Sequence, residues 1–292
     1  MFELTNKNAL PEAVALYEFI QNNYGKKMIS AAQESPGDKW HNLEIDFLKQ
    51  STGKLPAIKG FDFIHDDYDG VSARAKSWAR AGGIVTICWH TGIHGNTYND
   101  SKDELLNFNE LTEPGTPLNK LYMQRWEKAA EVLLGLMREG IPVLWRPFHE
   151  FDGQWFWWGK GGADVFIKLW RMMYKTFTDD YGLRNLIWVL GYSGEVKPGW
   201  YPGDEYVDIT GSDNYDATTN SAAFKRLKKI TEKPLAFHEV GKIPPIDEFY
   251  ASDCVWSWFM TWHTKYLIED NGAENMKKIY DDPRVITLED LK

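Results

Sequence analysis

The stretch Ile-Pro-Val-Leu-Trp-Arg-Pro-Phe-His-Glu at positions 141–150 begins as a run of strand-forming residues and ends on a histidine and a glutamate. A shorter stretch, Pro-Leu-Ala-Phe-His-Glu at 234–239, follows the same plan. Short apolar runs that are bounded by turn residues are typical of buried β-strands. The two polar dipeptides therefore mark the places where two buried strands are predicted to end.

Six further apolar runs lie along the chain and alternate with segments of helical periodicity. The predicted strands are 26–33, 58–64, 84–90, 141–148, 185–192, 206–213, 234–239 and 254–262. The predicted helices include 11–23, 69–81, 118–139, 163–177, 220–231 and 272–281. Alternating strands and helices imply parallel pairing. Eight strands favour a closed (β/α)8 barrel that occupies residues 1–292 as a single domain, with a doubly wound open sheet as the alternative.

Glu150 and Glu239 fall at the ends of the fourth and seventh predicted strands. In such a barrel all strands end on one face, where the long connections 90–117, 149–162 and 192–205 are expected to build a cleft. Two carboxyl groups at these ends would face each other across the mouth, at the separation of about 5–5.5 Å that suits a retaining glycosidase. In that reaction one group protonates the leaving oxygen and the other is the nucleophile.

Composition excludes several classes of partner. Acidic residues outnumber basic ones by 42 to 33, and no stretch gathers Lys and Arg as a nucleic-acid-binding surface would. No apolar run reaches the roughly 18 residues that a membrane span needs. Cys88 and Cys254 lie within apolar runs and are predicted to be buried free thiols.

Aromatic residues make up 15% of the chain. Four of them, Trp155, Phe156, Trp157 and Trp158, follow one another in a polar, glycine-rich loop. This is an unusual place for core residues, so the cluster predicts flat surfaces on which sugar rings stack.

The run RPFHEFDGQWFWWG at 146–159 resembles glycoside hydrolase family 26. Supporting matches are Trp-His at 89–90, Ser-Asp-Asn-Tyr at 212–215, Glu-Val-Gly at 239–241 and Trp-Phe-Met-Thr-Trp-His at 258–263, so the resemblance covers nearly the whole chain. It implies a β-mannanase that acts on mannan, glucomannan or galactomannan without a cofactor or metal. In that case Glu150 is the acid/base and Glu239 the nucleophile. It also implies that His90 contacts the substrate and that His149 binds at or near the sugar 2-hydroxyl.

The neighbouring residues fit these roles. Trp155 and other aromatic side chains would raise the pKa of Glu150 by desolvation. Arg146 or Tyr215 would donate hydrogen bonds that keep Glu239 ionised. The two carboxyl groups are thereby expected to differ in pKa in the direction that catalysis needs.

Three other residues complete the predicted site. Asp213 lies two positions before a tyrosine on one strand face, so both side chains are expected at the mouth, with Asp213 holding Arg146 or a sugar hydroxyl. Trp262 is the expected platform under the sugar at the cleavage point, and Trp258, four positions earlier, is the alternative. His238 is expected to be structural support.

Other functions stay open on the sequence. A metal-dependent hydrolase would draw its ligands from the histidines and glutamates at the strand ends, although the spacing His-Glu-x-x-His is missing. A carbohydrate-binding protein would keep the aromatic cleft but has no use for two matched glutamates. The same scaffold would also suit β-1,3-1,4-glucan or β-1,3-xylan.

The first residues lack the pattern of a secretion signal. A polymeric substrate is nevertheless met outside the cell, so we expect a secreted or cell-surface monomer whose signal is absent from this sequence. A cytoplasmic enzyme is the alternative.

Overall fold

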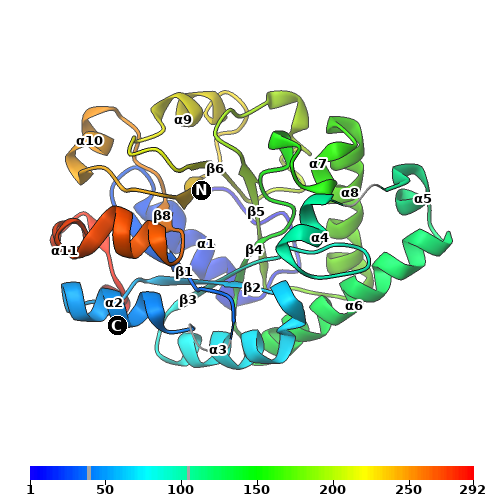
Figure 1. Ribbon diagram of the computed structural model, residues 1–292, viewed down its shortest axis with the longest axis horizontal. Coiled ribbons are helices and arrows are strands. Elements are labelled where there is room, and N and C mark those ends of the chain that lie inside the picture. Colours follow the sequence, from blue (N-terminus) through cyan, green and yellow to red (C-terminus); the bar gives the residue numbers. More distant parts are fainter. Residues whose placement is uncertain (38–40, 104–105) are drawn as a thin grey trace.

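Eight parallel strands close into a barrel in this computed structural model, which describes residues 1–37, 41–103 and 106–292 (Figure 1). The strands are β1 (Met28–Gln33), β2 (Ile58–Asp62), β3 (Ile84–Cys88), β4 (Val143–Arg146), β5 (Leu186–Tyr192), β6 (Ile209–Asn214), β7 (Leu235–Val240) and β8 (Trp258–Thr261). Because β1 pairs with both β2 and β8, the sheet has no open edge between them. The predicted (β/α)8 barrel is confirmed, and the open-sheet alternative is wrong.

Helices surround the barrel, and a short strand, β9 (Val285–Ile286), pairs with the start of β1 (Figure 1). The α-helices are α1 (Pro11–Asn23), α2 (Leu43–Thr52), α3 (Tyr68–Arg80), α4 (Tyr98–Asp103), α5 (Phe108–Thr112), α6 (Pro117–Met137), α7 (Trp157–Lys160), α8 (Ala163–Lys175), α9 (Ser221–Leu227), α10 (Ile246–Ala251) and α11 (Gly272–Asp281). Single turns of other helix types are η1 (Ile64–Asp66), η2 (Phe151–Gly153), η3 (Thr176–Asp180), η4 (Pro198–Trp200), η5 (Tyr266–Asn271) and η6 (Leu288–Leu291).

Alternation along the strands divides the core into two layers. Residues such as Leu144 and Ile187 point into the barrel, whereas their neighbours Trp145 and Trp188 pack outward against the helices. Both faces are therefore apolar, as expected for a parallel sheet that is covered on each side. Each fully buried aliphatic side chain contributes about 1.5–3 kcal/mol to folding.

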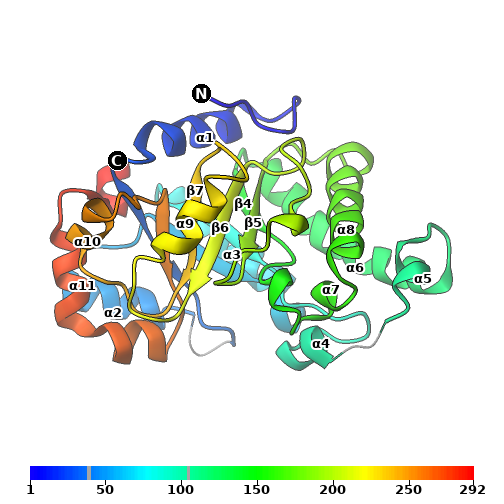
Figure 2. The same ribbon diagram turned by 90° about the horizontal axis from the view of Figure 1, so that it is seen from above.

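Helix α1 covers the N-terminal end of the barrel, and α4 and α7 lie near the opposite end (Figure 2). Pro11 opens α1, whose buried residues, Tyr17 and Ile20 among them, join the interior cluster. The Tyr17 hydroxyl donates to the carbonyl of Asp208, just before β6, at 2.9 Å. With this end covered, the C-terminal ends of the strands are the place left for a cleft.

Two helices outside the six that the sequence pattern indicated are α2 and α10. The buried residues of α2 are Glu44, Leu48 and Thr52, a face too polar for an apolar periodicity. Glu44 is tolerated there because it accepts hydrogen bonds from Ser35 and from the backbone of Thr264. Helix α10 has only six residues. The predicted connection 90–117 contains α4 and α5, and its residues 104 and 105 lie outside the described part of the chain.

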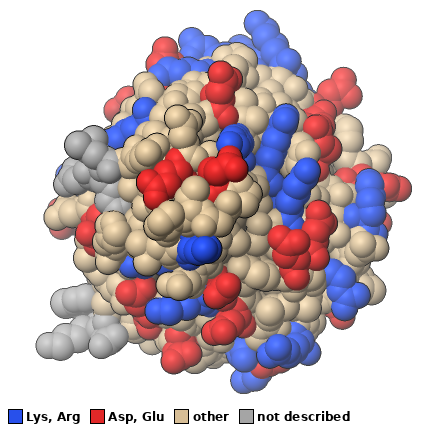
Figure 3. Space-filling view, turned by 90° about the vertical axis from the view of Figure 1, so that its right-hand side faces the viewer, with Lys and Arg blue, Asp and Glu red and all other residues tan. Residues whose placement is uncertain are grey.

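Both cysteines are buried free thiols, as predicted. Among the described residues, no helix combines the length and the apolar character needed to cross a bilayer. The side of the molecule at the right of Figure 1 carries Lys and Arg interspersed with Asp and Glu, without one continuous basic area (Figure 3).

Candidate active site

A cleft of about 640 Å³ opens at the C-terminal ends of the strands. Five of the predicted site residues line it: His90, Glu150, Trp155, Tyr215 and Trp262. The other lining residues are Gln33, Glu34, Pro36, Asp62, Ile64, His65, Tyr98, Lys102, His263 and Tyr266. Of these, the polar residues at the ends of β1 and β2 were not predicted.

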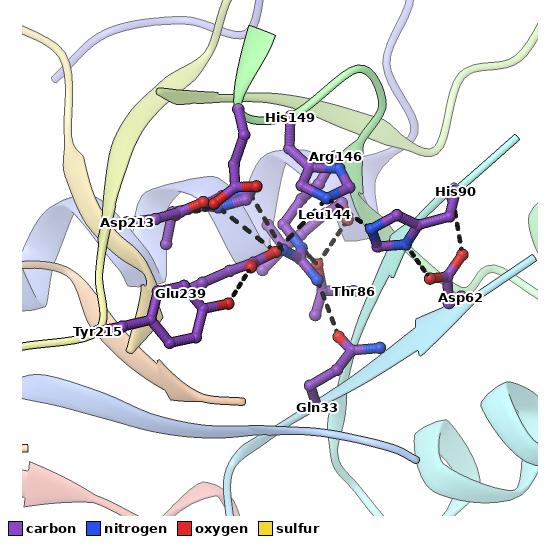
Figure 4. A network of polar contacts seen from close by, with 12 residues as sticks. Gln33, Asp62, Thr86, His90, Leu144, Arg146, His149, Asp213, Tyr215 and Glu239 are labelled. Atoms are coloured by element: carbon purple, nitrogen blue, oxygen red, sulfur yellow. Dashed lines mark hydrogen bonds and ion pairs between the residues drawn. The ribbon is translucent and has the colours of Figure 1, made fainter. Parts of the chain in front are cut away.

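Four predicted residues, Arg146, His149, Asp213 and Glu239, lie directly beneath the cleft. Each is at most 2% exposed. Together with residues of β1, β2 and β3 they form one polar network (Figure 4). The structure therefore brings the predicted residues together at one end of the barrel, but the sequence did not separate those that face the cleft from those that lie beneath it.

Glu150 is held by an unusual backbone turn after β4. Phe148, Glu150 and Gln154 all have positive φ angles, of 51°, 53° and 63°. Each such non-glycine residue costs about 1–3 kcal/mol, which the surrounding contacts must offset. The backbone N–H of Glu150 donates to the carbonyl of Gly191 at 2.7 Å. The indole of Trp155 donates to Glu150 Oε2 at 2.9 Å, so the carboxyl group is aimed at the cleft.

Only the first residue of the aromatic cluster 155–158 is available to a sugar. Trp155 is 40% exposed, whereas Phe156, Trp157 and Trp158 are at most 1% exposed. The indole N–H groups of Trp157 and Trp158 donate to the carbonyls of Thr91 and His149. The prediction of a stacking surface is thus wrong for three of the four residues, because the loop folds back and uses them to brace the floor of the cleft.

His238 and Glu239 are consecutive, yet both reach Arg146. Consecutive residues of a regular strand point to opposite faces. Here the pairing of β7 shifts register against both β6 and β8, between Phe237 and Val240 on β7 itself. Such an irregularity re-aims a side chain. Arg146 Nη1 consequently lies 3.1 Å from His238 Nε2 and 3.3 Å from Glu239 Oε1.

Arg146 was also a candidate for binding substrate, but it is fully buried and does not line the cleft, so a direct contact with a sugar stays a prediction. Its guanidinium donates to Thr86 Oγ1 at 3.0 Å and to Gln33 Oε1 at 2.9 Å, besides its contacts with β7 (Figure 4). Glu239 Oε2 accepts a hydrogen bond from the hydroxyl of Tyr215 at 2.9 Å. Arg146 is therefore a buried support of Glu239.

Asp213 does not hold Arg146 by a hydrogen bond. Its Oδ1 lies 2.7 Å from His238 Nδ1, and its carboxyl group is near enough to that of Glu150 for each to influence the pKa of the other. Asp213 and Glu239 are thus buried beside the Arg146 guanidinium, and the partly buried carboxyl group of Glu150 lies close to both.

Burial raises the pKa of all three carboxyl groups. Desolvation and the charge of Asp213 raise the pKa of Glu150 well above its ordinary range, as a general acid requires. Desolvation, Asp213 and Glu150 together raise the pKa of Glu239 to about 8, against the lowering effect of His238 and Arg146. Arg146 and Tyr215 do donate to Glu239, as expected, but burial and the neighbouring carboxyl groups of Asp213 and Glu150 raise its pKa by more than Arg146 lowers it.

A buried chain of polar side chains runs along the other wall of the cleft. Asp62 Oδ2 lies 2.5 Å from His90 Nδ1, and His90 Nε2 lies 3.1 Å from His149 Nε2 (Figure 4). Burial alone would raise the pKa of Asp62, but the charge and hydrogen bonds of His90 lower it. Asp62 was missed, although it ends the run Ile-Lys-Gly-Phe-Asp as Glu150 and Glu239 end theirs. His149 is 1% exposed, so its contact with a sugar hydroxyl stays a prediction.

Trp262 follows β8 and lines the cleft, with its ring 6.2 Å from that of His90. Trp258 begins β8, is 1% exposed and packs with the barrel interior. Of the two candidates for a sugar platform, only Trp262 has its face at the cleft.

Two groups of side chains have the composition of a metal site: Asp62 with Cys88 and His90, and Asp213 with His238 and Glu239. In the first, the 2.5 Å between Asp62 and His90 is a hydrogen bond, whereas two ligands of one tetrahedral Zn²⁺ lie roughly 3.3 Å apart. In the second, His238 Nδ1 and Asp213 Oδ1 are 2.7 Å apart, again a hydrogen-bond distance, and the Arg146 guanidinium is already bound to Glu239. Neither arrangement fits a metal ion.

Comparisons with known proteins agree along the whole chain. The sequence profile of glycosyl hydrolase family 26 matches residues 5–290. A mannan endo-1,4-β-mannosidase from Thermothelomyces thermophilus is 31% identical over 99% of this chain and 63% of its own length. For mannan endo-1,4-β-mannosidases A and B from a Piromyces species the identity is 29%, and the chain spans 50% and 53% of their lengths. The chain therefore spans about half to two thirds of these relatives.

Solved structures give the same result for the fold. A ruminal endo-β-1,4-mannanase has a TM-score of 0.92 at 30% identity, over 99% of this chain and 70% of that one. A β-mannanase from a symbiotic protist of the termite Reticulitermes speratus, complexed with a gluco-manno-oligosaccharide, has a TM-score of 0.90 at 32% identity. That match covers 99% of this chain and 97% of the other.

Proposed function

This chain belongs to glycosyl hydrolase family 26, and we propose that it is a retaining β-1,4-mannan hydrolase. Glu150 is the acid/base and Glu239 the nucleophile of a double displacement. The single observation that carries the proposal is the pair of carboxyl groups at the ends of β4 and β7. One of them lines a sugar-sized cleft and the other lies beneath it. The names of the relatives supply the choice of mannan.

In the first step Glu239 attacks the anomeric carbon, and a glycosyl–enzyme ester forms. The proton of Glu150 passes to the leaving oxygen as the glycosidic bond breaks. Water then attacks the ester, Glu150 takes its proton, and Glu239 leaves with its electron pair. The Tyr215 hydroxyl and Arg146 each donate to Glu239, and these hydrogen bonds favour the carboxylate that must attack and later depart.

Trp262 supplies an aromatic face at the cleft, and His90 presents an imidazole edge beside it. A sugar stacked on the indole would therefore have His90 within reach of its hydroxyl groups. Trp155, on the Glu150 side, offers a second exposed face. We propose that these two tryptophans bind the sugars on either side of the bond that is cleaved.

The substrate is tested by product analysis on mannohexaose and on mixed-linkage β-glucan. Hydrolysis of mannohexaose, with a product that first appears as the β-anomer in proton NMR, supports the proposal. Hydrolysis of the glucan alone contradicts the choice of mannan, and an α-anomer contradicts the double displacement. A ladder of early products indicates internal cleavage, and mannobiose alone indicates attack from a chain end.

The roles are tested with Glu150→Gln and Glu239→Gln. Both should lose activity on mannohexaose, and E150Q should keep the first step on a substrate whose leaving group needs no proton. Glu195→Gln is the matched control, because that glutamate is 71% exposed and outside the cleft. A non-catalytic binder would bind mannohexaose with no turnover in the parent protein.

We further propose that residues 1–292 act as a single catalytic domain and as a monomer. Because mannan is a polymer met outside the cell, we place its action there.

A further inference from the structure

The two ring nitrogens of His238 have different partners. Nε2 lies 3.1 Å from Arg146 Nη1, and Nδ1 lies 2.7 Å from Asp213 Oδ1. A guanidinium only donates hydrogen bonds, so Nε2 must accept and carries no proton. The neutral ring then carries its proton on Nδ1 and donates it to Asp213. Arg146 thus selects the tautomer of His238.

The ring of His238 is fully enclosed between two glycines. A Cβ atom on Gly191 would lie 2.5 Å from the ring, and one on Gly211 would lie 2.7 Å from His238 Cβ. Burial and the charge of Arg146 lower the pKa of His238 to about 3. The ring therefore stays neutral, and its orientation is set by packing as well as by hydrogen bonds.

The second oxygen of Asp213 has an unusual environment. Oδ2 is buried, and within the described residues no N–H or hydroxyl group donates to it. Its neighbour is the carboxyl group of Glu150. Two neighbouring carboxylates in a poorly hydrated site do not both stay ionised, and a proton shared between them would give Oδ2 the partner that it lacks. Either carboxyl group could hold that proton.

We propose that His238 is a positioning residue: by donating to Asp213, it keeps the shared proton on Glu150. This inference rests on the proposed function, because a general acid must be protonated before the glycosidic bond breaks. Arg146 fixes the tautomer of His238. In that tautomer His238 donates to Asp213 and keeps it ionised, so the proton stays on Glu150.

Several other groups face this pair of carboxyls. They are Asp152 on η2, Arg146 on β4, Glu239 on β7, Tyr215 after β6, Tyr98 on α4 and the indole of Trp155. The indole donates to Glu150 and so favours its ionised form, which is the opposite of the effect of His238. Trp155 is 40% exposed and competes with water, whereas His238 is fully buried. A hydrogen bond is stronger where water is excluded, so the buried donor decides the position of the proton.

Two substitutions separate the two nitrogens of His238. An asparagine places its amide nitrogen near the position of Nδ1, and a glutamine places its terminal amide near Nε2. H238N therefore keeps a donor for Asp213, while H238Q removes it. Loss of a hydrogen bond to a charged group shifts the proton population toward Asp213 by on the order of tenfold.

With H238Q the plateau of kcat on mannohexaose should fall about threefold or more. The basic limb of its pH–kcat profile should move to higher pH. The reason is that Asp213 now also holds the proton, and Asp213 and Glu150 titrate as one coupled pair. On a dinitrophenyl β-mannobioside, whose leaving group needs no acid, the same variant should lose much less. H238N should keep the basic limb where the parent has it. If both variants lose activity equally on both substrates and neither moves the limb, His238 is only structural and the proposal is wrong.

A second measurement needs no enzymatic turnover, so it tests the proposal even if a variant does not fold or the parent protein is inactive. In ¹⁵N NMR of histidine-labelled parent protein, His238 should be the neutral Nδ1–H tautomer from pH 5 to 9. A charged ring, or the Nε2–H tautomer, overturns the proposal even if H238Q does not fold. If the parent cleaves no mannan but the tautomer is as expected, the proposed function has failed, and with it the positioning role of His238; only the assignment of its tautomer stands.

Discussion

Glu239→Gln should make the protein inactive and, above neutral pH, more stable than the parent. The pKa of Glu239 rises from 4.5 to about 8 in the folded protein. Between these values the folded state binds more protons than the unfolded state, so the free energy of unfolding falls as pH rises through this range and levels off above it. At about 1.4 kcal/mol per pKa unit, the loss is at most about 5 kcal/mol.

Glutamine has nearly the same shape as glutamate and does not ionise. Its carbonyl can accept from Arg146, and its amide can donate to the Tyr215 hydroxyl, which accepts as well as donates. The variant should therefore keep its fold without the cost of a buried carboxylate.

The assay is urea denaturation of parent, E239Q and E195Q at pH 5, 6, 7, 8 and 9. The stability of E239Q relative to the parent should grow steadily from pH 5 to about 8. That of E195Q should show no such trend, because residue 195 is exposed. A difference between E239Q and parent that stays constant with pH, or that turns against E239Q as pH rises, would refute the reasoning.

Three further predictions concern the neighbours of the two glutamates. Asp62→Asn replaces the oxygen that faces His90 Nδ1, so kcat/KM on mannohexaose should fall about 10–100-fold. Asp164→Asn, on the exposed start of α8, is the control. An equal effect of both variants would contradict the role of Asp62 in holding His90. Trp155→Phe keeps an aromatic face but removes a donor that lowers the pKa of Glu150, so the basic limb of kcat/KM should move to higher pH by less than about one unit; a shift to lower pH would be the wrong sign. Gly191→Ala puts a methyl group against the ring of His238 and should lower the free energy of unfolding by about 1–3 kcal/mol. Gly199→Ala, with no atom near its Cβ, should change it by about 0.5 kcal/mol or less, and similar losses in both would show that crowding of His238 is not the cause.

The barrel and the position of its cleft could be predicted because both follow from periodicity. Apolar runs alternating with amphipathic segments define parallel strands, and residues at or just beyond the ends of such strands, as Glu239 and Glu150 are, must lie on one face. The same rule would have found Asp62, which also ends a strand, had it been applied to every run. Helix α2 could not be found this way, because its buried Glu44 is compensated by hydrogen bonds from Ser35, before the helix, and from Thr264, far away in the sequence.

Burial within the loop after β4 was beyond prediction for a related reason. The composition of 155–158 indicates an aromatic surface, but exposure depends on where the loop turns. The positive φ angles at Glu150 and Gln154 fold it back over the barrel. Trp158 then donates to the carbonyl of His149 at the start of the same loop, and Trp157 donates to that of Thr91 on the loop after β3. The second contact joins distant segments, which leaves no local pattern in the sequence.

The two His-Glu dipeptides have the same sequence but different surroundings, and a register shift is the reason. His149 lies beyond the end of β4 and turns toward His90, with its Nδ1 buried and without a partner among the described residues. His238 lies within β7, where a regular strand would point it and Glu239 to opposite faces. The irregular pairing of β7 turns both side chains toward Arg146. One guanidinium therefore fixes the tautomer of the histidine and donates a hydrogen bond to the glutamate. Regular pairing of β7 would point the two side chains to opposite faces of the sheet. His238 could then no longer donate to Asp213, and nothing would hold the shared proton on Glu150.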